Sequence, residues 1–170
     1  MIGLHFIHLI ADPWGHVYND SSALQTGMTF LHFGALLFAG GYAVASDRWV
    51  LRARRAAADQ QNVVLDELSE IHRPVVIGLA VLVATGIAMA LADVDTLLVS
   101  PVFWIKMGCF ALLLGNGLML RRAESHLRAV NLHAPEQAAR WWNSLRGSAL
   151  RSMSLWVITV LLGTLLTSAS

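Results

Sequence analysis

Four apolar segments of helix length set the limits on how this chain folds. Their bounds are residues 27–46, 75–92, 102–120 and 152–170. A helix rises about 1.5 Å per residue, so roughly 20 residues cross the ~30 Å apolar layer of a bilayer. Hydrophobic residues make up 56% of the chain and charged residues only 14%, which is too apolar a balance for an ordinary soluble domain. The sequence therefore predicts an all-α integral membrane protein, a single domain of residues 1–170 built as a four-helix bundle.

The distribution of basic residues predicts the orientation. Residues 47–74 hold five of the twelve Lys and Arg and residues 121–151 hold six, whereas residues 1–26 and 93–101 hold none. Basic residues in short connections stay on the cytoplasmic side. We therefore expect a multi-pass protein of the bacterial inner membrane, with both termini in the periplasm.

Two connections and the N-terminus are predicted to be helical as well. Residues 59–74, "DQQNVVLDELSEIHRP", place apolar side chains at helical spacing, and Pro135 followed by Glu136 is a typical first turn. We expect both to extend spans as cytoplasmic helices. The first eleven residues, "MIGLHFIHLIA", are too short to span and lack the basic start of a signal peptide. They are expected to form a short interfacial helix.

Small and polar residues recur at helical spacing in each span. Such lines predict contacts between helices, because membrane helices associate through close backbone approach and interhelical hydrogen bonds. The lines are Met28, His32, Ala35, Ala39 and Ala43; Ala80, Ala84, Ala88 and Ala92; Lys106, Cys109, Leu113, Asn116 and Leu120; and Ser148, Ser152, Thr159 and Gly163.

His32 is the one ionisable residue of the first span, which makes it a candidate for function. A neutral histidine hydrogen-bonded to a carbonyl or a serine is the structural alternative. Counting inward from the outer ends of the spans places Met89 and Lys106 near the level of His32, and Met28 one turn above it. His72 falls at the opposite face of the membrane, too far away to share an ion with His32.

Imidazole and thioether donors suit copper, and histidine with histidine or methionine also ligates haem iron. The candidate metal ligands are His32, His5, His8, His16, Met28, Met89 and Met107. The candidate cofactor-binding residues are His32 and Lys106. The ammonium of Lys106 can instead reach the lipid headgroups, or hold Asp93, Asp95, a haem propionate or a quinone oxygen. No CxxCH motif is present, which excludes covalent attachment of a c-type haem.

Three stretches within residues 27–120 resemble the helical core of CopD-type copper-resistance proteins and related four-helix bacterial membrane proteins. They are "LHFGALLFAGG", "GLAVLVATGIAM" and "SPVFWIKMGCFALLLGN". A histidine opens a span that ends in a glycine pair, Thr-Gly stands near the outer end of the next span, and a lysine enters the third. The resemblance implies that His32 is the site residue and Lys106 its companion.

Three functions follow as hypotheses. The first is a periplasm-facing His/Met site on His32 that handles a metal, with copper favoured. The second is a b-type haem subunit for electron transfer, and the third is a cofactor-free accessory subunit of a larger membrane complex. The sequence contains no hydrolytic triad, phosphate-binding loop or HExxH motif, so we expect no hydrolase or transferase, while a redox role remains open. The expected partners are the lipid bilayer and other subunits or further copies of the chain. The net charge of +1 gives no sign of a nucleic-acid partner.

Overall fold

The computed structural model describes residues 2–53, 58–130 and 135–168, and the side chains of residues 8–53, 60–129 and 137–166. This part of the chain is almost entirely helical, which confirms the all-α prediction. The helices are α1 (Ile2–Asn19), α2 (Ser22–Ala53), α3 (Ala58–Ala92), α4 (Val94–Val99), α5 (Pro101–Val130) and α6 (Pro135–Ser168).

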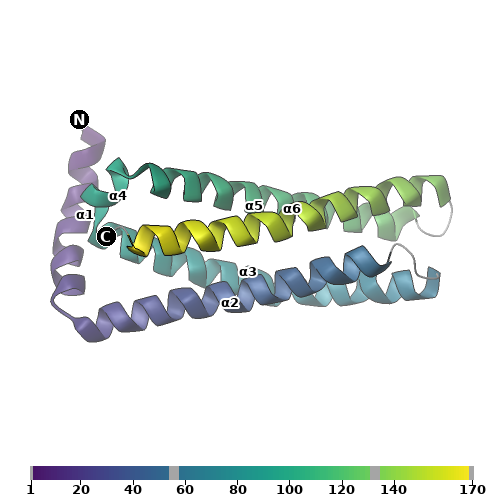
Figure 1. The fold of residues 1–170 in the computed structure, drawn as a ribbon, viewed down its shortest axis with the longest axis horizontal. Coiled ribbons are helices and arrows are strands. Elements are labelled where there is room, and N and C mark those ends of the chain that lie inside the picture. Colours follow the sequence, from purple (N-terminus) through teal and green to yellow (C-terminus); the bar gives the residue numbers. More distant parts are fainter. Residues whose placement is uncertain (1, 54–57, 131–134, 169–170) are drawn as a thin grey trace.

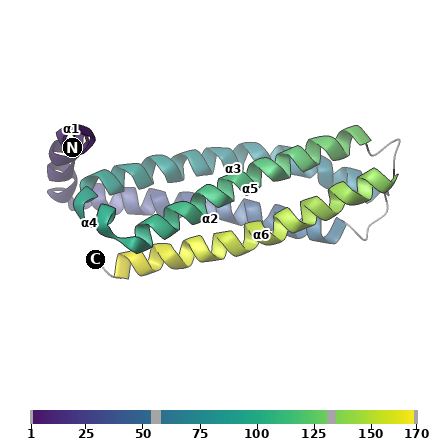
Figure 2. The ribbon, with the colours of Figure 1, turned by 90° about the horizontal axis from the view of Figure 1, so that it is seen from above.

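Four of these helices run side by side as an antiparallel bundle, and α1 lies across one end of it (Figures 1 and 2). We call that end, where α4 and the last described turn of α6 also lie, the α1 end. At the opposite end, the far end, α2 and α5 finish while α3 and α6 begin. The most extensive helix contacts join α5 to α6 and α2 to α3, and a smaller interface joins α2 to α6. The bundle therefore consists of two helical hairpins that meet along α2 and α6.

Each of the four long helices is long and apolar enough to cross a bilayer. They contain 32, 35, 30 and 34 residues, and the described part of each has the length and composition of a membrane span. The chain is a multi-pass membrane protein with four candidate spans. The predicted helical extensions are confirmed, because residues 60–74 belong to α3 and Pro135 begins α6.

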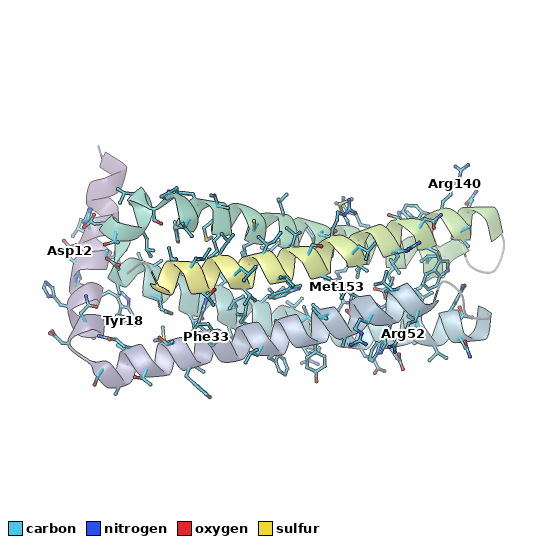
Figure 3. The ribbon with its side chains drawn as sticks, in the orientation of Figure 1. Asp12, Tyr18, Phe33, Arg52, Arg140 and Met153 are labelled. Carbon is cyan, nitrogen blue, oxygen red and sulfur yellow. The ribbon has the colours of Figure 1, made fainter. Side chains whose placement is uncertain are left out.

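The best-packed part of the molecule lies in the far half. Its core draws buried side chains from all four long helices, among them Val50, Leu68, Leu127 and Leu145. Towards the α1 end many large apolar residues are exposed instead, such as Phe30 on α2, which suits a surface in contact with lipid. The arginines of the described residues lie in the far half or at mid-helix, as Figure 3 shows for Arg52 and Arg140.

The predicted contact lines hold for three of the four spans. Ala35 and Ala39 are buried on α2, Leu113 and Asn116 on α5, and Ser148, Ser152 and Thr159 on α6. The prediction is wrong for α3, where Ala80 and Ala84 are exposed and Gly78, Leu82 and Thr85 are buried. Glycine explains the difference: a Cβ on Gly78 would lie only 2.9 Å from the Cβ of Ala39. The two backbones thus approach more closely than a line of alanines would permit.

The N-terminal helix is longer than expected and packs on the end of α3. α1 contains 18 residues, with Pro13 inside it. The indole nitrogen of Trp14 donates a 2.6 Å hydrogen bond to the carbonyl oxygen of Ala88. Gly15 is buried against the backbone of Ala92, whose carbonyl oxygen lies 3.4 Å from the position of a Cβ. These contacts position α1 across the end of the bundle.

Candidate functional site

His32 on α2 is half-buried and is held by α3. Its Nδ1 lies 2.9 Å from Oγ1 of Thr85. The Thr85 hydroxyl donates its only proton to the carbonyl oxygen of Val81, 2.8 Å away. It therefore accepts the hydrogen bond from Nδ1–H of the imidazole. In the neutral ring this leaves the lone pair on Nε2, which is the atom that can bind a metal or accept a proton.

A glycine makes room for the imidazole. A Cβ on Gly86 would lie 3.2 Å from Cε1 of His32. His32 thus lies opposite Thr85 and Gly86, about one helical turn deeper than the level of Met89 that counting from the span ends had indicated. Thr85 and the backbone at Gly86 together fix the orientation of the ring.

Lys106 on α5 points across the bundle to α6. Its Nζ lies 3.7 Å from the position that a Cβ of Gly163 would occupy, and its side chain is half-buried. Asp95, which the sequence offered as a partner for Lys106, faces His8 instead, with 3.5 Å between Oδ1 and Nε2.

Two of the three candidate methionines lie on the helix faces that meet at His32. Met28 is one turn from His32 on α2, and Met89 is one turn from Thr85 on α3; both are half-buried. Because α2 and α3 are antiparallel, Met28 and Met89 each lie one turn closer to the α1 end than His32 and Thr85 do. Met107 differs, since 42% of its surface is exposed on α5. Of the three candidate methionines, Met28 and Met89 therefore share the faces of α2 and α3 that carry His32 and Thr85.

The N-terminal histidines form a separate group on α1. His8 lies between two carboxylates: Nδ1 is 3.2 Å from Asp12 and Nε2 is 3.5 Å from Asp95. His16 is exposed and lines a polar depression of about 300 Å³ with Asp12, Asp93 and Asp95. The side chain of His5 lies outside the described residues. Within the described parts, no three His, Cys, Asp or Glu side chains gather in a way that would hold a metal ion. The structure thus leaves His8 and His16 at the surface, apart from His32.

His72 takes part in a polar network of the far half. Its Nδ1–H donates to the carbonyl oxygen of Leu68 at 2.7 Å, and its Nε2 lies 3.8 Å from Glu124 on α5. Along α3, thirteen residues separate His72 from Thr85, which is about 20 Å at roughly 1.5 Å per residue. The separation of His72 from His32 is confirmed.

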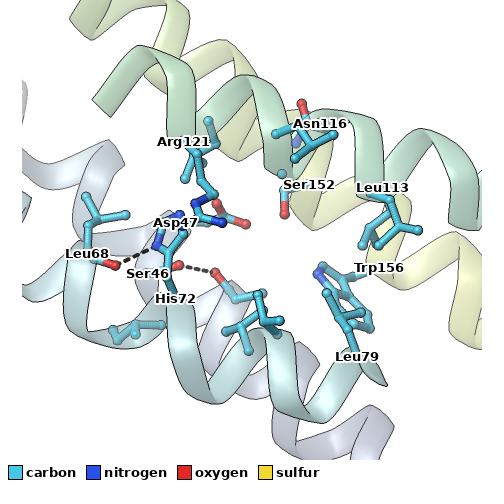
Figure 4. Close-up of a pocket in the computed structure, with 18 residues that line it drawn as sticks. Ser46, Asp47, Leu68, His72, Leu79, Leu113, Asn116, Arg121, Ser152 and Trp156 are labelled. Atoms are coloured by element: carbon cyan, nitrogen blue, oxygen red, sulfur yellow. Dashed lines mark hydrogen bonds between the residues drawn. The ribbon is translucent and has the colours of Figure 1, made fainter. Parts of the chain in front are cut away.

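The structure brings forward one residue that the sequence reasoning missed, Asp47. Only 2% of it is exposed, and its Oδ2 has no hydrogen-bond partner among the described residues. It lines a cavity of about 180 Å³ enclosed by all four long helices (Figure 4). A signal was present in the sequence, because Asp47 continues the contact line of α2 at a spacing of four from Ala43. The predicted contact line ends at Ala43, because Asp47 lies just beyond the apolar segment of residues 27–46.

Comparison with known proteins adds no family to this description. No family model matches the sequence, and no curated protein or solved structure matches it significantly. The resemblance to CopD-type proteins stays a prediction, and the chain is described by its fold, as a membrane protein with four candidate spans.

Proposed function

We propose that this membrane protein handles copper through a site at the α1 end, built on Nε2 of His32. The hydrogen bond from Nδ1 of His32 to Thr85 is the observation that carries the proposal. Histidines that bind metals almost always donate their second ring N–H to an oxygen, which fixes the tautomer and orients the ring. Thr85 supplies that oxygen, so the imidazole is prepared to offer Nε2 to an ion.

Met28 and Met89 supply the remaining donors in this proposal. Both are half-buried, and both lie one turn towards the α1 end from the His32–Thr85 pair. Soft thioether ligands together with imidazole select Cu(I) over the harder cations. The resemblance to CopD-type proteins also points to copper.

A b-type haem on His32 is the second candidate, and Lys106 is the observation that favours it. Lys106 is half-buried inside the bundle, with its ammonium beside Gly163 of α6, and a positive charge there opposes a bare cation at the same end of the bundle. It would attract the propionate groups of a haem. The positive charge of Lys106 would therefore weaken the binding of copper and strengthen the binding of haem. Removal of this charge distinguishes the two candidates experimentally.

The first experiment measures metal content and the absorption spectrum of the purified chain in detergent. Copper at near one equivalent without a Soret band supports the proposal, and the His32→Ala variant loses that copper. A reducible Soret band that is absent from His32→Ala supports the haem instead. The matched control is His16→Ala, an exposed histidine of α1. A protein that takes up neither copper nor haem overturns both candidates and leaves the accessory subunit.

Lys106→Gln is the discriminating variant. Removal of its positive charge raises the Cu(I) affinity if the ligand is copper, and lowers the retention of haem if the ligand is haem. Met28→Leu combined with Met89→Leu lowers the Cu(I) affinity by at least tenfold, whereas the exposed Met107→Leu leaves it unchanged. Equal losses in both methionine variants would remove the thioether donors from the proposal.

We propose that the α1 end faces the periplasm, because the described arginines lie in the far half or at mid-helix and basic connections stay in the cytoplasm. A membrane-impermeant thiol reagent tests this in intact cells. With Cys109 replaced by Ala, it labels Asp20→Cys but not Glu67→Cys. Labelling of Glu67→Cys alone would reverse the orientation.

A further inference from the structure

The cavity beside Asp47 is mostly apolar and reaches the surface between α3 and α5. Its volume is about 180 Å³. Exposed apolar side chains from both helices line it, including Val76 of α3 and Leu118 of α5, while buried Trp156 of α6 lies deeper (Figure 4). Val76 and Leu118 belong to two candidate spans, so we take this opening to face the bilayer and to be accessible to molecules dissolved in it.

Asp47 is the polar group of this cavity that still needs a partner. Ser152 is a hydrogen-bond partner of its carboxyl group, but Oδ2 has none among the described residues. A buried carboxylate oxygen without a donor is costly in apolar surroundings. A ligand in the cavity that donates a hydrogen bond to Oδ2 would remove this cost.

Three other polar residues of the lining, Ser46, Asn116 and His72, already make hydrogen bonds within the bundle. The hydroxyl of Ser46 donates to the carbonyl oxygen of Ala43 at 2.8 Å. The amide nitrogen of Asn116 donates to the carbonyl oxygen of Ser148 at 2.8 Å, and the Ser148 hydroxyl lies 2.9 Å from the Asn116 side-chain oxygen. His72 donates to the carbonyl oxygen of Leu68. Recognition of a polar group in the cavity therefore depends on Asp47.

Charge and size narrow the class of ligand. Arg121 also lines the cavity, and its positive charge offsets the negative charge of an ionised Asp47, so the lining favours a neutral ligand over an amine or another cation. An apolar cavity of about 150 Å³ accommodates a benzene ring, so about 180 Å³ accepts a ring with small substituents. We propose that this cavity binds a neutral, bilayer-soluble aromatic ring with a hydroxyl group, a phenol or hydroquinone, whose O–H donates to Oδ2 of Asp47.

A matched pair of probes tests the hydrogen bond. The purified chain in detergent is titrated calorimetrically with tetramethylphenol and with its methyl ether, against a protein-free micelle blank. The phenol binds saturably and at least about tenfold more tightly than the ether, as the cost of leaving a buried polar atom without a hydrogen bond implies. Asp47→Asn reduces that preference about tenfold, and Glu67→Gln, an exposed acid of α3, leaves it unchanged. Equal binding of the two probes to the original chain would overturn the proposal.

A second pair of variants tests the position without touching Asp47. Gly117 lines the cavity and Gly115 does not, and a Cβ at either glycine of α5 would meet nothing within 4 Å. Gly117→Leu fills the cavity and abolishes saturable binding of the phenol, while Gly115→Leu retains it. Undiminished binding to Gly117→Leu would place the phenol elsewhere and refute the inference. None of these outcomes depends on copper or on His32.

Discussion

The imidazole of His32 on α2 donates a 2.9 Å hydrogen bond to the hydroxyl of Thr85 on α3, and this hydroxyl donates its own hydrogen bond to the carbonyl oxygen of Val81. Thr85→Val keeps the shape of the side chain but removes the acceptor. We expect it to lower the Cu(I) affinity by about 10 to 100-fold, the usual cost of losing such an orienting partner. Thr85→Ser retains a hydroxyl and restores most of the affinity. Competition with a chromophoric Cu(I) chelator measures both variants, and equal affinities would show that the hydroxyl does not orient the ligand.

Asn116 and Ser148 hold α5 and α6 together through reciprocal hydrogen bonds, two of them at 2.8 and 2.9 Å. A double-mutant cycle with Asn116→Ala and Ser148→Ala should give a coupling energy of about 0.6 to 1.7 kcal/mol, the range of such pairs in membranes. Ser154 is the control, because its hydroxyl bonds within α6 to Leu150 at 3.1 Å. Ser154→Ala should show no coupling to Asn116→Ala. Thermal unfolding in detergent supplies the energies, and a coupling near zero for the first pair would contradict the prediction.

Gly78 sets the separation of α2 and α3. A Cβ there would lie 2.9 Å from the Cβ of Ala39 and 3.2 Å from a ring carbon of Phe38. Gly78→Ala should therefore destabilise the chain by about 1 to 3 kcal/mol through overpacking. Gly34→Ala is the matched variant, since a Cβ there meets nothing within 4 Å. Alanine is the better helix former, so this control should be neutral or up to ~1 kcal/mol more stable. Gly78→Ala should melt at a lower temperature than Gly34→Ala, and the reverse order would contradict the prediction.

The far half contains a charged network centred on Glu124, which is only 7% exposed. Arg128 pairs with Glu124 at 3.3 Å and with Asp66 at 2.9 Å, and it also donates to the carbonyl of Leu65. Arg128→Gln leaves Glu124 with less compensation for its burial. We expect a loss of about 1 to 2 kcal/mol, below the cost for a fully buried pair because Arg128 is partly exposed. Arg122→Gln, an exposed arginine of the same helix, should change stability by less than about 0.5 kcal/mol. Equal melting temperatures for the two variants would assign the network no role in stability.

The fold followed from the sequence because a bilayer leaves a chain few options. Each crossing must satisfy its backbone hydrogen bonds within the segment, so apolar length alone identifies helices. Spacing also located much of the core, including Ala39, Asn116 and Ser148. The spacing is misleading on α3, where the line of alanines predicts the contact with the neighbouring helix but Gly78 and Gly86 make it. The close approach of α2 and α3 requires residues without a Cβ, so small size alone is not sufficient.

The site was predicted less completely than the fold. Counting residues along two antiparallel helices whose ends are uncertain gives the position of a residue along the bundle only to within about one turn. For this reason the sequence predicts Met89 opposite His32, where Thr85 lies. The tautomer of His32 depends on the internal bond from Thr85 to Val81, and no sequence pattern encodes that bond. Asp47 was missed because a charge next to an apolar segment usually marks the end of a span. Here it continues the buried face of α2 instead.

The division into two hairpins has a consequence for biosynthesis. α2 and α3 make their extensive contacts with each other, and α1 packs mainly on α3. These elements precede α5 and α6 in the chain, so we expect the half that carries His32 and Thr85 to make its internal contacts while the second hairpin is still being translated. We expect the interface of α2 with α6 to form last. The second hairpin then adds Lys106 to a histidine whose orientation is already determined.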